Sequence, residues 1–356
     1  MRLWWLAVAS LDVGVISRSA ILILVLPALT PACARSHAPT DAVAVADGGC
    51  EVVEGPNLLA TGAMQHAATD LLAHDGDVFW FGAVHVFGYL HAEGGTTELA
   101  HNARGPLYGI HASGELLYYG GSTRDGDALM AFDRHRGSHD EVHVGTAALD
   151  VTTHGDSLYV ASCGGVVRSD GRGRAAVPWP LEVTGACPVR IHATATRLLV
   201  ESADGLVSLD AGGGDRQRLS IVGPDALFGA RGDDIFVRSH GDSVQGGGVV
   251  DARAISRTSA DRQTSLRPRV VAEPDFTITD AALGATHLYW LEYAQGGSDL
   301  RCTALDGGEV RTLAWHLDSA TQVAVAGDRV YWLEARLAPG REVFETQLWV
   351  MRVGPG

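Results

Sequence analysis

The densest group of potential metal-binding side chains consists of His135, His139, Asp140, Glu141 and His143. Imidazole and carboxylate groups without a thiol suit zinc or another transition metal. Their spacing differs from that of an HExxH helix, which places two histidines on one face. The segment predicts a hairpin turn running into a strand, where His139 and His143 do not meet. We interpret these side chains as solvated turn residues and expect no metal or other cofactor.

Four further histidines, His74, His111, His154 and His192, each lie near the end of a predicted first strand in consecutive repeat units. If those strands surround a channel, the four imidazoles form part of a ring near one mouth, and such a ring titrates at about pH 6–7. A polar residue is also expected at any turn of this kind. The registers differ by one or two residues between units, so the ring is kept only as the alternative metal-site hypothesis.

The sequence contains no local motif of a known catalytic chemistry. A nucleophile elbow, a phosphate-binding loop, a dinucleotide fingerprint and a Cys-x-x-Cys pair are all absent. All 27 basic residues are arginines, so no lysine is available for Schiff-base chemistry. Arg231-Gly232-Asp233 spells an adhesion tripeptide, but it occurs where every unit has a Gly/Asp turn, and chance explains it better. We assign no catalytic residue and favour a non-enzymatic role.

The N-terminal region reads as a targeting segment. An apolar run at 20–29 follows Arg18 and is too short to span a bilayer, as is typical of a signal peptide. Cys33 directly follows a small residue at the end of that segment, which resembles a bacterial lipoprotein box. We predict a signal peptide over 1–32, a lipid on Cys33, and a flexible tether over 33–50. The mature protein is then exported, either as a membrane-anchored lipoprotein of the bacterial cell envelope or as a periplasmic or secreted protein.

The charge of the chain restricts its partners. The formal net charge is −15, and because 1–32 holds two arginines and one aspartate, the chain from Cys33 onwards carries −16. An acidic surface repels phosphate backbones and anionic lipid headgroups. We expect no nucleic-acid partner and a membrane contact only through the lipid anchor.

A short strand with an aromatic residue near its centre recurs along the chain. Spacings of 39, 41, 40, 37, 53 and 42 residues separate seven markers, which are Phe79, Tyr118, Tyr159, Leu199, Phe236, Tyr289 and Tyr331. Valine, leucine, tyrosine and tryptophan dominate the strands, and glycine dominates the turns between them. Self-similarity of about 40 residues in a strand-rich unit is typical of propeller blades. The sequence therefore predicts an all-β β-propeller over 51–356.

Ring closure sets the expected number of blades. The last unit has room for only three strands and ends with the strand at 346–353, while an unassigned strand stands at 55–62. Exposed sheet edges invite aggregation, so 55–62 is expected to supply the outer strand of the last blade. This predicts seven four-stranded blades closed by an N-terminal strand. Six or eight blades are the alternatives if the weak unit around Leu199 is misread.

Once Cys33 is lipidated, four cysteines remain, and an exported protein meets an oxidising compartment. Cys163 follows the second strand of the third unit, and Cys187 lies between that unit and the next. Loops of these two kinds leave a propeller on the same face, so we expect a Cys163–Cys187 disulfide. Cys50 and Cys302 are the remaining pair by arithmetic. Alternatively, Cys302 is a free buried thiol within a strand.

Residues 288–314, LYWLEYAQGGSDLRCTALDGGEVRTLA, resemble a known repeat. Tyr289-Trp290 and Leu305-Asp306-Gly307 carry the similarity, and 330–334 repeats its first half. The repeat resembles the YWTD type of low-density-lipoprotein-receptor propellers and related bacterial envelope propellers. Leu-Glu stands here where the motif has Thr-Asp, and receptor propellers of this type have six blades. The resemblance implies a propeller fold and no catalytic residue.

These observations favour a binding or scaffolding module of the cell envelope with an unknown protein or glycan ligand. Function in such folds lies in the loops that a rigid disc displays. An apparent insertion at 239–268, rich in Ser, Gly and Arg, is the best candidate for a loop that contacts a partner. The alternative is a polymer-acting hydrolase or lyase with its site over the central channel. The sequence sets no oligomeric state.

Overall fold

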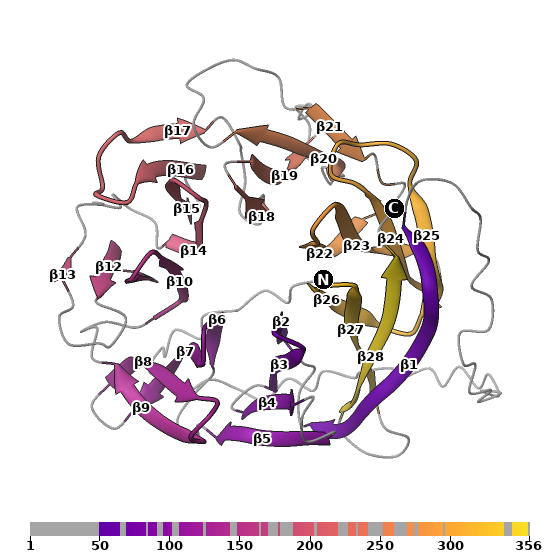
Figure 1. Ribbon diagram of the computed structural model, residues 1–356, viewed down its shortest axis with the longest axis horizontal. Helices are drawn as coiled ribbons and strands as arrows, with labels where there is room; N and C mark the ends of the chain where they lie inside the picture. Colours follow the sequence, from indigo (N-terminus) through magenta and orange to yellow (C-terminus); the bar gives the residue numbers. More distant parts are fainter. Residues whose placement is uncertain are drawn as a thin grey trace, which may run out of the picture.

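A computed structural model of the chain shows sheets arranged in a ring around a centre (Figure 1). It describes residues 50–64, 69–82, 85–90, 95–101, 107–123, 126–142, 148–163, 165–169, 177–178, 188–202, 205–219, 227–232, 234–240, 252–259, 269–272, 274, 277–294, 296–337 and 344–354. All the regular elements formed by these residues are β-strands. None of these residues belongs to a helix long and apolar enough to cross a membrane. The predicted signal peptide, Cys33 and the tether up to residue 49 lie outside the described residues.

The described strands form seven four-stranded antiparallel sheets, called blades 1–7 below. Each blade runs from an inner strand to an outer strand. Blades 1–3 consist of β2 (Thr69–His74), β3 (Asp77–Gly82), β4 (His85–Leu90) and β5 (Gly95–His101); of β6 (Tyr108–Ser113), β7 (Leu116–Thr123), β8 (Gly126–Asp133) and β9 (Ser138–Val142); and of β10 (Asp150–His154), β11 (Ser157–Ser162), β12 (Gly165–Ser169) and β13 (Val177–Pro178).

The chain continues round the ring in the same sense. Blades 4–6 consist of β14 (Pro188–Ala193), β15 (Arg197–Ser202), β16 (Gly205–Asp210) and β17 (Gln217–Leu219); of β18 (Leu227–Arg231), β19 (Asp234–His240), β20 (Ala252–Ser259) and β21 (Arg269–Ala272); and of β22 (Thr277–Leu283), β23 (His287–Ala294), β24 (Gly297–Ala304) and β25 (Arg311–Leu317). Blade 7 consists of β26 (Ala320–Ala326), β27 (Arg329–Leu337), β28 (Phe344–Gly354) and β1 (Glu51–Met64). The predicted β-propeller class is confirmed.

The recurring aromatic residue holds neighbouring blades together. Every marker lies on the second strand of its blade and points at the blade that follows. Tyr118 of β7 packs against Val151 and Leu158 of blade 3, and Tyr331 of β27 packs against Val78 and Trp80 of blade 1. The other interfaces follow the same rule: Phe79 with Leu117 and Tyr119, Tyr159 with Leu198 and Val200, Leu199 with Ile235 and Val237, Phe236 with Leu288 and Trp290, and Tyr289 with Val330 and Trp332.

This arrangement explains the strand composition. Both faces of each second strand are buried against neighbouring blades, so those strands carry continuous apolar runs instead of alternating polar and apolar residues. Burial of each such side chain contributes about 1.5–3 kcal/mol. Leu199 is fully buried in the same position as the aromatic markers, which is why the unit that looked weakest in sequence still forms a complete sheet.

The ring is closed by the two ends of the chain. β1 pairs antiparallel with β28, from Glu51 opposite Gly354 to Met64 opposite Phe344. Figure 1 shows β1 as the outermost strand, running along the rim outside β28. The expected closure by residues 55–62 is confirmed, and the closing strand is longer than its apolar pattern indicated, because backbone pairing continues past the apolar core.

A disulfide adds a second closure. Cys50, immediately before β1, is bonded to Cys302 on β24 of blade 6 across 252 positions of the sequence, with 6.2 Å between the Cα atoms. Both cysteines are buried in the core between blades 6 and 7. Cys50 was expected to end the flexible tether. It belongs instead to the folded domain, because its side chain completes that core.

The Trp-Leu-Glu sequences of blades 6 and 7 have a shared internal role. The indole N–H of Trp290 donates to Glu292 Oε2 at 3.3 Å, and that of Trp332 donates to Glu334 Oε1 at 3.1 Å. Residues two apart in a strand share a face, so each glutamate satisfies the buried nitrogen of its own strand. Burial raises the pKa of Glu334, while the Trp332 hydrogen bond and Arg336 oppose the rise. The glutamate that departs from the YWTD pattern therefore has a structural partner.

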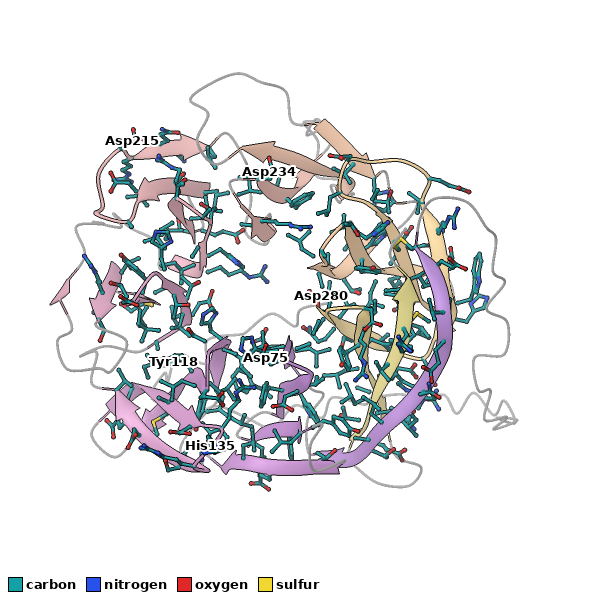
Figure 2. All side chains as sticks on the ribbon, viewed as in Figure 1. Asp75, Tyr118, His135, Asp215, Asp234 and Asp280 are labelled. Carbon is teal, nitrogen blue, oxygen red and sulfur yellow. A yellow bond between two sulfur atoms is a disulfide. The ribbon has the colours of Figure 1, made fainter. Side chains whose placement is uncertain are left out.

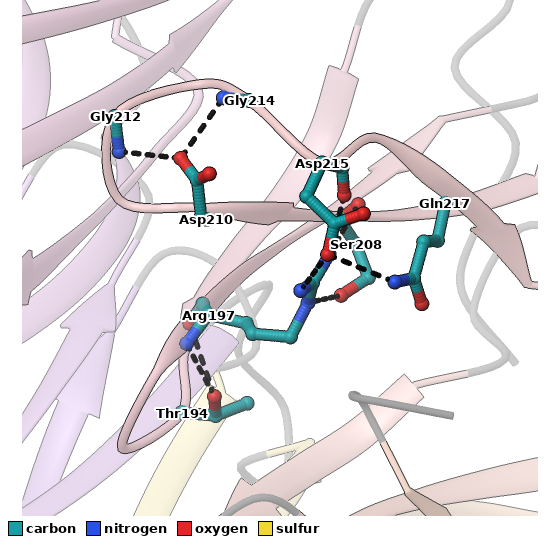
Figure 3. Close-up of polar contacts among 8 residues, drawn as sticks. All are labelled: Thr194, Arg197, Ser208, Asp210, Gly212, Gly214, Asp215 and Gln217. Atoms are coloured by element: carbon teal, nitrogen blue, oxygen red, sulfur yellow. Dashed lines mark hydrogen bonds and ion pairs between the residues drawn. The ribbon is translucent and has the colours of Figure 1, made fainter. Parts of the chain in front are cut away.

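A network of polar side chains holds the outer part of blade 4 (Figure 3). Arg197, at the start of β15 and 5 % exposed, donates through Nε to Ser208 Oγ at 2.6 Å and through Nη1 to Asp215 Oδ2 at 2.7 Å. Asp210 Oδ1 accepts from the N–H groups of Gly212 and Gly214 in the β16–β17 turn. The guanidinium fastens that turn to the second strand, where the short outer strand β17 provides little pairing.

The apparent insertion at 239–268 needs a correction. Its central residues form β20 (Ala252–Ser259), the third strand of blade 5, which pairs with both β19 and β21. The sequence ARAISRTS has a single large apolar residue, so it reads as a loop until β19 and β21 are placed beside it. Residues 241–251 and 260–268 lie outside the described residues.

We predict that the Cys50–Cys302 bond contributes about 4–5 kcal/mol to the free energy of unfolding, because it closes a very long loop in the unfolded chain. A Cys50→Ala/Cys302→Ala variant should unfold at a lower urea concentration than the parent chain. Unfolding in the presence of a reductant serves as the matched control. The reductant should lower the urea midpoint of the parent chain strongly and that of the double variant only slightly. Equal midpoints for the oxidised parent and the double variant would contradict the prediction.

Candidate functional site

The inner strands line the centre of the ring, and their composition divides it into two halves. The strands of blades 1–4 carry His74, His111, His154 and His192. At the level of His111 and His192, the strands of blades 5–7 carry the small residues Gly229, Ala282 and Ala324. Figure 2 labels Asp280 to the right of this central region and Asp75 below it. At this level the described part of the channel therefore has imidazoles on blades 2 and 4 and small residues on blades 5–7.

The four histidines do not share one level. His111 pairs with Tyr118 and His192 with Leu199, both opposite the marker position of the second strand. His74 pairs with Asp77 and His154 with Ser157, which places both two residues nearer the turn. The register difference seen in the sequence is thus real. Among the described residues, no group of three His, Cys, Asp or Glu side chains is arranged to hold a metal ion.

Two of these imidazoles, those of His111 and His192, are neutral at pH 7. Burial, with a smaller contribution from the nearby His74, lowers the pKa of His111 to about 4. Burial lowers the pKa of His192 to about 3, with smaller contributions from Arg190 and His111. His111 Nε2 lies 3.0 Å from Thr153 Oγ1 of blade 3, whereas the buried Nε2 of His192 has no hydrogen-bond partner in the described structure.

Two aspartates on inner strands tie adjacent blades together through the backbone. Asp150 Oδ2 accepts from the N–H of Ile191 in blade 4 at 2.8 Å, and its Oδ1 accepts from its neighbour Val151. Asp280 Oδ2 accepts from the N–H of Val323 in blade 7 at 2.9 Å. Burial raises the pKa of Asp150 to about 7, opposed by its two backbone hydrogen bonds and by Arg190 and assisted by the charge of Asp70. These carboxylates hold strands together, a role that the sequence analysis missed.

The histidine group around position 139 is structural. His135 is exposed in the β8–β9 turn, and β9 holds His139, Asp140 and Glu141, as the expected hairpin requires, while His143 lies outside the described residues. His139 Nε2 donates to Leu99 O of blade 1 at 2.7 Å, and its Nδ1 accepts from the Tyr119 hydroxyl at 3.0 Å. This imidazole therefore links blade 2 to the outer strand of blade 1.

The remaining predicted positions are only partly described. Cys163 is exposed in the turn after β11 and is disulfide-bonded. Cys187 lies outside the described residues, so the Cys163–Cys187 pairing stays a prediction. Arg231 and Gly232 form the β18–β19 turn, as the Gly/Asp turn pattern indicated, and Asp233 is outside the described residues.

A cleft of about 520 Å³ opens between blades 5 and 6 on the face that carries the β18–β19, β22–β23 and β24–β25 turns. Its volume lies within the range of small-molecule sites, roughly 300–1,000 Å³. Blade 5 and blade 6 each contribute charged, polar and apolar residues to its walls: Arg231, Gly232, Asp234 and Phe236 from the first, and Ala285, Thr286, His287, Ala304, Leu305 and Asp306 from the second. Sequence patterns could not identify this cleft, because it forms from turns of two different repeats.

The enclosed channel groups predict how stability depends on pH. His111 and His192 have lowered pKa values, so between about pH 6.5 and 4 the unfolded chain binds two more protons at these sites than the folded chain. Asp150 has a raised pKa and acts in the opposite direction over the same interval. Together, the three groups leave the unfolded chain with one more bound proton than the folded chain. Lowering the pH should therefore reduce the free energy of unfolding by about 1.4 kcal/mol per pH unit.

The sharpest check is the sign of this slope in a His111→Gln/His192→Gln variant. Of these three groups only Asp150 then remains, and its raised pKa should make the free energy of unfolding rise as the pH falls from 7 to 4. Urea unfolding at several pH values measures the slope, and a His135→Gln variant in the exposed β8–β9 turn serves as the control. A double variant that still loses stability in acid would show that other groups determine the acid response.

Comparison with known proteins identifies the fold and no family. No protein-family model and no curated protein matches the sequence. The chain is similar in structure to the Pan2 WD40 domain of Neurospora crassa, with 11 % identity, 83 % of this chain and 95 % of that chain covered, and a TM-score of 0.60. It is also similar to the RRP9 WD40 repeats, with 10 % identity, 86 % and 100 % covered, and a TM-score of 0.59.

A third similar structure is the β-propeller domain of the Trilobed protease from Pyrococcus furiosus, with 10 % identity, 80 % and 95 % covered, and a TM-score of 0.58. That domain is described as having an open velcro topology, whereas β1 pairs with β28 in the present chain. Identities this low show the fold alone. The chain is a β-propeller.

Proposed function

We propose that this protein is a binding or scaffolding β-propeller of the bacterial cell envelope, held at a membrane by a lipid on Cys33 and related to propellers with YWTD-type repeats. The cleft between blades 5 and 6 carries this proposal. It is a preformed concave site with both polar and apolar walls, set in a ring that strand pairing and a disulfide close. A rigid frame lowers the entropic cost of binding, because few groups must be ordered when the ligand arrives.

The channel supports binding over catalysis. A carboxylate or nucleophile within hydrogen-bond reach of an imidazole is one arrangement that a polymer-acting hydrolase or lyase over the channel could use. Both oxygens of Asp150 are engaged by backbone N–H groups, and His111 is paired with Thr153. Of the described channel histidines, His74 has a carboxylate partner, Asp75, whose side chain is 70 % exposed and open to water. The similar structures include two WD40 domains and the propeller of a protease, so the fold itself favours neither function.

The disulfide supports export. A buried Cys50–Cys302 bond is expected in a chain that folds in an oxidising compartment and is rare in cytosolic proteins. The signal peptide over 1–32 provides the route to that compartment. The polar segment after Cys33 then gives the propeller its distance from the lipid surface.

The intact mass of the protein from its native membrane fraction tests the anchor. We predict a mass equal to residues 33–356 plus three acyl chains, rising by about four mass units when two disulfides are reduced. A Cys33→Ser variant should leave the membrane fraction while keeping the thermal midpoint of the parent protein. An unlipidated mass with a different start, or a Cys33→Ser protein that stays in the membrane fraction, would overturn the lipid anchor.

A further inference from the structure

The cleft between blades 5 and 6 is built from rigid turns. In blade 6, Leu305 N–H donates to Thr286 O at 2.9 Å, which ties the β24–β25 turn to the β22–β23 turn. Gly307 N–H donates to Ala304 O at 2.9 Å and closes the tight turn, and Gly307, its last residue, has a φ of 82°, which glycine adopts without strain. Across the cleft, Arg231 of blade 5 donates through Nη1 to Gly284 O of blade 6 at 3.3 Å. The two walls are therefore joined before any ligand binds.

The polar groups of the walls include both hydrogen-bond donors and acceptors. Arg231 is exposed, and one of its five N–H groups is used by Gly284. Asp234 and Asp306 contribute carboxylate oxygens from opposite walls, and Figure 2 labels Asp234 on the blade 5 side. Thr286 is exposed at the turn, with its hydroxyl 2.8 Å from His287 Nδ1. Burial lowers the pKa of His287, so that ring adds no positive charge at pH 7.

The rest of the cleft surface is apolar. Leu305 of blade 6 supplies apolar surface, and Phe236 of blade 5, 1 % exposed, lies in the core beneath the cleft. Ala285 and Ala304 add small side chains that leave space above them. A ligand in this cleft must therefore place an apolar face beside hydrogen-bonding edges.

An ionic ligand of either sign meets a like charge here. An anion next to Arg231 approaches Asp234 and Asp306, and a cation next to those carboxylates approaches the guanidinium. A neutral ring with several hydroxyl groups avoids this conflict, because each hydroxyl both donates and accepts. Its hydroxyls can donate to carboxylates and accept from Arg231, while its C–H face covers Leu305.

We propose that the cleft between blades 5 and 6 is a binding site for a saccharide, one or two sugar rings in size. The assignment rests on the proposed binding function and specifies its ligand class. It places recognition on the face of the disc that carries the Arg231–Gly232 turn. Arg231 and Thr286 act as the main hydrogen-bonding residues, and Leu305 lines the apolar part, supported from below by the buried Phe236.

Saturation-transfer NMR and calorimetric titration of the purified full-length protein test the assignment. The probes are N-acetylglucosamine, chitobiose, maltose and cellobiose, with citrate and spermidine as ionic competitors. At least one sugar should bind with a Kd of about 1 mM or lower, and neither competitor should displace it. Absence of binding by all four sugars, or tighter binding of citrate or spermidine, would overturn the proposal.

Substitutions in the cleft walls test whether the sugar binds in the cleft. Arg231→Ala and Thr286→Val should each weaken sugar binding about tenfold or more, the equivalent of one hydrogen bond to a charged or buried group. Glu309→Gln is the matched control, since its 73 % exposed carboxylate follows the same β24–β25 turn and contacts Arg311 outside the cleft walls. Near-UV circular dichroism verifies that each variant is folded.

Unchanged sugar affinity in folded Arg231→Ala and Thr286→Val proteins would place the site elsewhere and reject the cleft. The titration is independent of the lipid anchor. Failure of every sugar with the anchor intact would therefore reject the saccharide site and leave the envelope module standing. Loss of the anchor with sugar binding intact would reject the lipid anchor and leave the saccharide site standing.

Discussion

Every interface in this molecule depends on closing the ring. Each blade buries its two faces against its neighbours, so an open ring would leave two large apolar faces in water, one on each side of the gap. The core of Tyr331 with Val78 and Trp80 forms only when blade 7 meets blade 1. The pairing of β1 with β28 completes blade 7, and the Cys50–Cys302 bond joins the start of β1 to blade 6. Two independent closures thus protect one cooperative set of cores.

The polar residues at the centre follow from the same geometry. Inner strands converge there, and backbone N–H groups on some of them are bonded by side chains of the adjacent blade. Asp150 and Asp280 accept from the N–H groups of Ile191 and Val323, and farther out His139 contacts a carbonyl of blade 1. Residues that look like catalytic acids and bases in sequence are thereby used to join blades. Their altered pKa values report enclosure between strands, which structural groups share with active sites.

The cleft between blades 5 and 6 shows how such a frame acquires a site. Loops supply function when a rigid scaffold positions them, and three turns from two blades meet at this cleft. The Arg231–Gly284 hydrogen bond and the Leu305–Thr286 hydrogen bond fix the turns relative to each other. Hydrogen-bond donors and acceptors beside an apolar surface then favour a neutral hydroxyl-rich ligand over an ion.

The sequence by itself determined what depends on neighbours along the chain. Aromatic residues at intervals of about 40 positions and Gly/Asp turns predicted the blades, because hairpin turns and the pairing of consecutive strands are local. The closure followed from counting strands, since the last unit lacked one and an unassigned strand stood near the N-terminus. Tertiary structure alone decided the rest. The backbone role of Asp150 and the third-strand identity of 252–259 both depend on how one strand lies against another. The cleft was out of reach for the same reason, since Arg231 and Asp306 are far apart in sequence and meet only when two blades pack.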